Sequence, residues 1–158
     1  TFVWDPVLAK AKQNGKVITT SGQIAAKTGK ATFDALAVTN DFAKNNDAFL
    51  AQLVQVLADA DKSYTVHKGA WTADSAQVKA VAKWSGAEAP SVPASLALYA
   101  FVPPAEQASN KWLGGGKDSV VAKSLAATAA FLKEQGTIQQ VLPDYGVGVN
   151  PAWVARAK

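Results

Sequence analysis

A shortage of predicted strands beside many predicted helices is the feature that most constrains this chain. Two runs are rich in β-branched and aromatic residues: residues 16–20 (KVITT) and 32–39 (TFDALAVT). From residue 41 onward, apolar residues recur mostly at helical spacing. Two strands alone do not make a stable sheet in water. We therefore expect the missing strands to come from polypeptide outside these residues, and the absence of Met leads us to expect a processed or partial chain.

Composition excludes several classes of function. The 158 residues are 49% hydrophobic, which is typical of a globular chain, and no run of about 18 apolar residues predicts a membrane span. The chain has no Cys, which excludes disulfides, thiolate catalysis and Cys-based zinc sites. Sixteen Lys and Arg residues are scattered among twelve acids, for a net charge of +4, and no basic block is interleaved with aromatics. We expect no nucleic-acid partner, no metal and no cofactor.

Capping residues and breakers divide the chain into helices. Asp5 and Pro6 are expected to begin the first helix, which a left-handed Gly15 would end. Residues 21–30 are expected to be a loop with at most one helical turn. Later helices are predicted over residues 41–44, from 46 to about 64, 74–86, 89–99, 104–112, 119–136 and from 150 onward. The predicted buried faces are Phe49, Leu50, Leu53, Val56, Leu57, Ala60 and Tyr64 in the second of these, and Val121, Leu125, Thr128, Phe131 and Leu132 in the sixth.

Asp34 is the most informative single residue. It lies inside an apolar, β-prone run, and an isolated carboxylate is too costly to bury without a partner. Such a residue must face a ligand, another part of the protein or water. From the spacing alone, an Asp that caps a neighbouring loop and an Asp that contacts a ligand both remain open, and the structural role is the commoner one.

Other chemical constellations are weaker. His67 is the single histidine and could pair with Asp59 or Asp61, but no nucleophile lies nearby in sequence, so a surface His after a helix is favoured. Glu106 and Glu134 are too isolated to predict a glycosidase pair. We predict no catalytic residue, and therefore a protein that is not an enzyme.

Several segments together resemble the nitrate, sulfonate and taurine family of solute-binding proteins that serve ABC importers. The segments follow one order along nearly the whole chain, and they are residues 3–6, 14–19, 32–34, 41–44, 74–83, 91–93, 130–136 and 141–145. The likeness falls on the C-terminal half of such proteins. It implies an α/β fold, namely the helix-rich C-terminal half of a two-lobe, type II periplasmic-binding-protein fold. Residues 1–31 would be the tail of the second lobe, and residues 32–158 the crossover strand and the C-terminal part of the first lobe.

The resemblance also implies a ligand and partners. The family binds small solutes between its lobes, in the periplasm or otherwise outside the cytoplasm, and delivers them to ABC permease subunits. By this likeness Asp34 would contact the ammonium group of a zwitterion such as taurine, Trp4 would lie in the cleft, and the sulfonate site would belong mostly to a missing N-terminal half. The chain departs from the family pattern at Thr28, Ala31, Leu36 and residues 39–40, so taurine, another sulfonate or a different small solute all remain open.

Two classes of function therefore follow from the sequence. One is a solute-binding protein of an importer that takes taurine or a related sulfonate. The alternative is a non-catalytic helical interaction or structural module that derives from the same fold or is cleaved from it. The intact mass of the natural protein distinguishes them, because the receptor requires about twice this chain.

Overall fold

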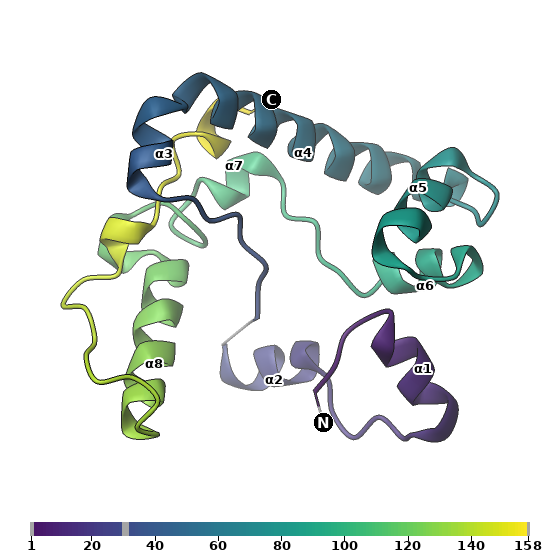
Figure 1. The fold of residues 1–158 in the computed structure, drawn as a ribbon, viewed down its shortest axis with the longest axis horizontal. Helices are drawn as coiled ribbons and strands as arrows, with labels where there is room; N and C mark the ends of the chain where they lie inside the picture. The colour runs from purple at the N-terminus through teal and green to yellow at the C-terminus, as the bar shows by residue number, and fades with distance from the viewer. Residues whose placement is uncertain (1, 30–31, 158) are drawn as a thin grey trace. The chain divides into compact units, whose positions relative to one another are not determined.

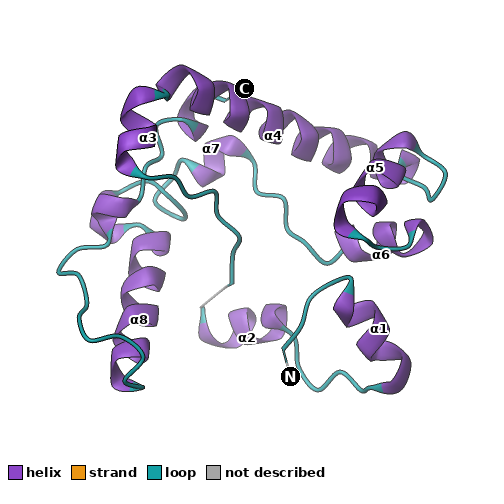
Figure 2. Ribbon diagram, viewed as in Figure 1, coloured by secondary structure: helices purple, strands orange, loops and turns teal. Residues whose placement is uncertain are grey.

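The computed structural model describes residues 2–29 and 32–157, and these are helical with long connections (Figures 1 and 2). The α-helices are α1 (Val7–Asn14), α2 (Ser21–Thr28), α3 (Asn40–Asn45), α4 (Asp47–His67), α5 (Ala76–Ser85), α6 (Val92–Leu96), α7 (Pro104–Gln107) and α8 (Val120–Glu134). Single turns of 3₁₀ helix are η1 (Lys68–Ala70), η2 (Ala89–Ser91), η3 (Gly116–Asp118), η4 (Gly146–Gly148) and η5 (Val154–Arg156). No described helix has both the length and the hydropathy needed to span a bilayer.

The two predicted strands are the main correction. Residues 16–20 and 32–39 are extended or irregular connections, and the described part of the chain contains no β-strand (Figure 2). A strand needs a neighbour to satisfy its backbone N–H and C=O groups, and these runs have none here. Each run ends instead in a threonine that caps a helix. Thr20 Oγ1 accepts a hydrogen bond from the Gln23 N–H, and Thr39 Oγ1 accepts one from the Phe42 N–H.

Helix α2 replaces the predicted loop over residues 21–30, of which residue 30 lies outside the described part. Its N-terminus carries a capping box: the Thr20 hydroxyl bonds the Gln23 N–H, and the Gln23 side chain bonds the Thr20 N–H in return. The Thr-x-x-Gln spacing was visible in the sequence and is the signal that the loop prediction missed.

The ends of several helices confirm the predicted capping. Ser119 caps α8 as predicted, by accepting the Ala122 N–H at 3.1 Å. The helix predicted over residues 74–86 begins slightly later, as α5, with Ser75 as its cap. Gly136, with φ of 71°, follows the end of α8 as predicted. Gly15 differs from its prediction, because its φ is −121°. A Cβ there would approach the Ala11 carbonyl oxygen to 2.8 Å, so this glycine serves a close backbone approach.

Two other predicted helices are shorter than expected. The helix predicted over residues 104–112 ends at Gln107. At the C-terminus, the Asn150 side chain accepts the Ala152 N–H and makes a turn, so the helical segment begins only at Val154, as the 3₁₀ turn η5. A side-chain bond of this kind offers the backbone an alternative to a regular helix start.

The chain divides into two compact units of two segments each, with boundaries after Asp34, inside α4 after Lys62, and after Phe101. Unit 1 comprises Thr1–Asp34 and Ser63–Phe101. Its core is the α5, η2 and α6 region, with Val78 and Val92 fully buried. Tyr64 is also buried, and its ring meets Trp71 at 5.2 Å and Phe101 at 4.8 Å between centroids.

Unit 2 comprises Ala35–Lys62 and Val102–Lys158. Its buried residues include Leu50, Ser119, Val121 and Val154. The turn η4 packs against η3, and α7 packs against η5. The predicted faces are only partly buried. Phe49, Val56, Leu57, Leu125 and Phe131 are exposed, whereas the small residues Ala122 and Ala129 are buried on α8. The exposed members of these faces therefore lack the cover that the sequence pattern predicts for them.

Candidate functional site

The candidate site residues Trp4 and Asp34 both fall in unit 1. Trp4 precedes α1, and its carbonyl oxygen accepts the Leu8 N–H at 2.9 Å, so its backbone is fixed by the first turn of the helix. Its side chain is free of that constraint and is 74% exposed. A large aromatic ring held out from a fixed backbone is available to stack on a ligand or to pack on further polypeptide.

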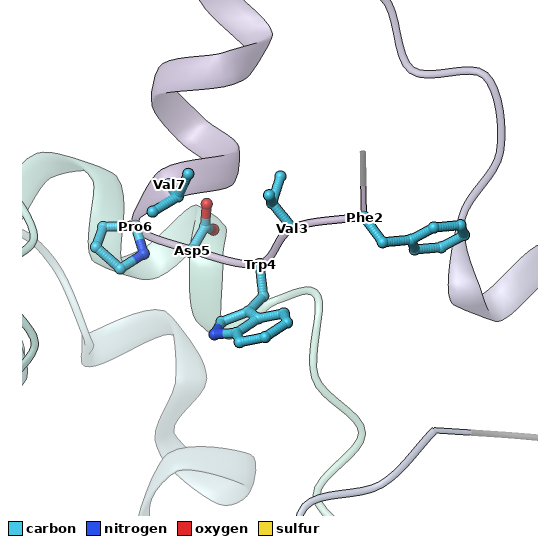
Figure 3. Close-up of a pocket in the computed structure, with 6 residues that line it drawn as sticks. All are labelled: Phe2, Val3, Trp4, Asp5, Pro6 and Val7. Atoms are coloured by element: carbon cyan, nitrogen blue, oxygen red, sulfur yellow. The ribbon is translucent and has the colours of Figure 1, made fainter. Parts of the chain in front are cut away.

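Trp4 helps to line an open hollow of about 190 Å³ formed by residues 2–7 (Figure 3). Figure 3 shows its ring on the opposite side of the chain from the side chains of Val3 and Asp5. The lining is largely apolar, with Phe2, Val3, Pro6 and Val7. Ligand pockets in proteins are typically larger, roughly 300–1,000 Å³, and are built from several elements. This hollow is therefore one wall of a possible site and not a complete pocket.

Among the described residues that line the hollow, Asp5 is the charged one, and its carboxylate already has a hydrogen-bond partner. Its Oδ1 accepts a hydrogen bond from the Ala9 N–H at 2.8 Å, in the first turn of α1. The sequence predicted Asp5 as the N-cap and Pro6 as the first helical residue, whereas the structure has Pro6 at the N-cap and begins α1 one residue later, at Val7. Asp5 still satisfies a backbone N–H of the first turn from the position before the cap. A carboxylate near a helix N-terminus is also favoured by the helix dipole.

Asp34 is exposed and does not line the hollow. Within residues 2–29 and 32–157, no hydrogen bond or ion pair engages its carboxylate. The structural alternative was that Asp34 caps a neighbouring loop. Its carboxylate makes no such hydrogen bond to a described residue. A solvated carboxylate can accept a charge-assisted hydrogen bond from an incoming ammonium group without first losing another partner.

The weaker candidates do not assemble into a catalytic site. The Nδ1 atom of His67 lies 3.3 Å from the Ser63 carbonyl oxygen, one turn earlier in α4, while Asp59 accepts a bond from the Gln55 amide. Burial raises the pKa of Asp61. Glu106 lies 3.5 Å from the Trp112 indole nitrogen. Within the described ranges, no group of three or more His, Asp or Glu residues could hold a metal ion.

Asp47, another carboxylate, forms the best-defined polar cluster among the described residues, and the sequence did not predict it. Arg156 binds it through both terminal nitrogens, at 3.0 Å and 2.7 Å, and the Trp153 indole N–H donates to its Oδ1 at 2.8 Å. The hydrogen bonds from Arg156, and next the one from Trp153, lower the pKa of Asp47 from 3.8 to about 2. The partners lie more than 100 positions apart, so no local pattern could have indicated the contact.

One comparison with curated proteins now bears on these residues. The chain is 29% identical, over 153 residues, to the taurine-binding periplasmic protein of Escherichia coli (strain K12). The match covers 97% of this chain and 46% of that protein, so the chain spans slightly less than half the length of this relative. No protein-family model matches the chain. The relative is named as a binding protein, which agrees with the resemblance drawn from the sequence motifs.

Proposed function

We propose that the chain is the C-terminal half of a solute-binding protein of an ABC importer, located outside the cytoplasm and without enzymatic activity. The observation that carries this proposal is the match of nearly the whole chain to the taurine-binding periplasmic protein. The ligand is taurine or a related small sulfonate, and the partners are the remaining half of the binding protein and the permease subunits.

The proposed contacts use the two residues singled out by the sequence. Asp34 accepts a charge-assisted hydrogen bond from the ammonium group of the ligand, because its carboxylate engages no other described residue. Trp4 supplies an aromatic wall, since its exposed ring lines the hollow before α1. The sulfonate is held by residues of the other half.

Calorimetric titration of the complete two-lobe protein tests this function. Taurine and ethanesulfonate differ by the amine, so their affinities report on the proposed ammonium contact. We expect taurine to bind about ten- to a hundredfold more tightly, the value of one charged hydrogen bond. Equal affinity for the two would remove Asp34 from this role, and no heat with either, or with other small sulfonates, would remove the function.

A second candidate is a helical interaction module derived from the same fold. The observation that favours it is the absence of any β-strand among the residues that the structure describes. The intact mass of the protein purified from its natural source separates the two. A mass near 16.4 kDa supports the module, and about twice that mass supports the receptor.

A further inference from the structure

Asn14 and Gly15, at the end of α1, are an Asn-Gly pair, and the sequence contains no other. The side-chain amide of an asparagine can react with the backbone nitrogen of the next residue. This reaction is easiest before glycine, because glycine has no Cβ to obstruct the approach. The other asparagines are followed by Asp, Asn, Lys or Pro. The pair at the end of α1 is therefore the place in this sequence where such a reaction meets least obstruction.

The two groups that would react are not held by hydrogen bonds. At the ends of α2 and α5, the N–H groups of Gly29 and Gly86 donate to carbonyl oxygens four residues earlier, at 2.8 Å and 2.9 Å. Gly15 has an extended backbone instead, with φ of −121° and ψ of 160°, and its N–H donates no such bond to a described residue. The side-chain amide of Asn14 likewise bonds no described residue.

The path of the backbone requires glycine at position 15. A Cβ there would approach the Ala11 carbonyl oxygen to 2.8 Å, which is closer than Cβ atoms come in proteins. A larger residue, which would slow the reaction, is therefore disfavoured by the structure itself. The reactive pair is a consequence of the way in which α1 ends.

This end of α1 is polar and exposed to water. Residues 10–20 are all exposed, and Lys12 and Lys16 lie on either side of the pair. Nearby cations favour the negative charge that develops on the Gly15 nitrogen as it loses its proton. They also make this end costly to cover with other polypeptide, because a buried charge needs a partner. Water, which completes the reaction, therefore reaches the pair.

We infer that Asn14 is a site of spontaneous deamidation, which yields isoaspartate and aspartate. The Gly15 nitrogen bonds to Cγ of Asn14, the bond from Cγ to the side-chain nitrogen breaks, and that nitrogen leaves as ammonia with the proton from Gly15. The product is a cyclic succinimide. Water then adds to one of its two carbonyl carbons and breaks the bond from that carbon to the ring nitrogen. Opening at the main-chain carbonyl gives isoaspartate, and opening at the side-chain carbonyl gives aspartate.

Either product places a carboxylate at the last residue of α1. The C-terminus of a helix is its negative pole, so a new negative charge there is unfavourable. Isoaspartate also inserts a methylene group into the main chain. Helix α1 has only eight residues, and its first turn fixes the backbone of Trp4. We expect the modified helix to fray from its C-terminal end, because so short a helix is marginal.

Incubation of the full chain in mildly alkaline oxygen-18 water tests the site. Each event should add one heavy oxygen at residue 14, detected by mass spectrometry of proteolytic fragments, and an isoaspartate-specific methyltransferase should label the isoaspartate. Asn110 is an internal control, because it is also exposed but precedes Lys111, whose N–H donates to Ser109 Oγ at 3.3 Å. Conversion at Asn14 should be at least about tenfold faster, since Gly15 has neither a Cβ nor such a bond.

A synthetic peptide of residues 10–20 separates the effect of the structure from that of the sequence. The rate in the protein should lie within about tenfold of the rate in the peptide, because no local opening has to release the Gly15 N–H first. Asn14→Gln keeps the side-chain amide but closes a ring less readily, so it should abolish the rapid uptake of heavy oxygen at this position.

The effect on α1 is measured with Asn14→Asp, which carries the charge of the product. Amide exchange over residues 11–13 should be faster in Asn14→Asp than in Asn14→Gln, and equal exchange would refute the effect on the helix. Three results would overturn the modification site itself. They are uptake no faster than at Asn110, a rate far below that of the peptide, which would show that the fold holds the Gly15 N–H, or aspartate without isoaspartate, which would indicate direct hydrolysis.

Discussion

Asp34 and Asp47 are both exposed carboxylates, yet their surroundings differ completely. Asp47 receives three hydrogen bonds from side chains, whereas Asp34 receives none from the described residues. The bonds to Asp47 hold a structural contact, and its carboxylate is already paired with a cation. The carboxylate of Asp34 has no such partner among the described residues, so it remains available to bind a cationic ligand.

The proposed ligand role predicts a specific loss on substitution of Asp34. Asp34→Asn keeps the shape of the side chain and removes its charge, so taurine affinity of the complete protein should fall about ten- to a hundredfold. The melting temperature without ligand should not change, because the carboxylate is solvated. Asp74→Asn, at another exposed acid of unit 1, is the control and should leave affinity unchanged. A large drop in melting temperature for Asp34→Asn alone would show a structural role.

The Asp47 cluster predicts a pH dependence at the acid end. Because the folded-state pKa of Asp47 is about 2 and its ordinary value is 3.8, its stabilising effect is complete above about pH 4 and is lost as the pH falls toward 2. The indole N–H resonance of Trp153, identified by its absence in Trp153→Phe, should titrate in that range. A midpoint near the ordinary value, or an unchanged titration in Asp47→Asn, would show that the cluster does not form in solution.

At the scale of elements, helix boundaries were predictable because their causes are local. Ser119 and Gly136 act within one turn of their own position, so sequence spacing identified both ends of α8. The strand predictions were wrong for the opposite reason. Residues 16–20 and 32–39 have the composition of strands, but a strand forms only beside a pairing neighbour, and local composition does not show whether one is present. The buried faces were predicted only in part: Leu50, Tyr64 and Val121 are buried, whereas Phe131 is exposed, because its burial depends on what covers α8. Of the site, Asp34 and Trp4 could be named from the sequence, whereas the Asp47 cluster could not.

The cap of α8 provides a test of that local logic. Ser119→Ala removes the hydroxyl that accepts the Ala122 N–H, and Ser119 is fully buried, so water does not replace the bond. A lost cap costs about 0.5–2 kcal/mol, which corresponds to roughly two- to thirtyfold faster amide hydrogen exchange in the first turn of α8. Ser124→Ala, inside the same helix, should not accelerate exchange, because alanine is the better helix former. Equal exchange in the two variants would contradict the capping role.

The contact between η3 and η4 can be tested with two glycines of one turn. A Cβ at Gly146 would collide with the backbone of Gly116 and Lys117, whereas a Cβ at Gly148 meets nothing within 4 Å. Gly146→Ala should therefore separate the two turns, since a backbone clash cannot be relieved by a rotamer change, and exchange should accelerate over residues 116–119. Gly148→Ala should leave that segment protected. The reverse order of effects would show that the turns do not pack together.

For the whole molecule, the decisive quantity is the small amount of side chain that is fully buried. The largest fully buried side chains in the described residues are Leu50, Val78, Val92 and Ser119, and they are shared between two units. Helices stabilised by so little packing depend on their own propensity and capping, which is marginal at these lengths. The chain without its complement should therefore have helical segments and little cooperative tertiary structure.

This predicts a shallow unfolding transition for residues 1–158 in isolation. The denaturant slope m reflects the surface newly exposed on unfolding. A chain that already exposes 11468 Å² gains less surface on unfolding than a compact chain of the same mass would, so m should fall below the value usual for its length. Circular dichroism should show helix content that declines gradually with temperature. An apolar dye should bind before unfolding begins, because α3 and α4 expose the apolar side chains Phe42, Phe49, Val56 and Leu57. Addition of the complementing half should sharpen the transition and displace the dye. A sharp melt of a monomeric chain, with no dye bound, would mean that these residues form a complete domain and that no complement is needed.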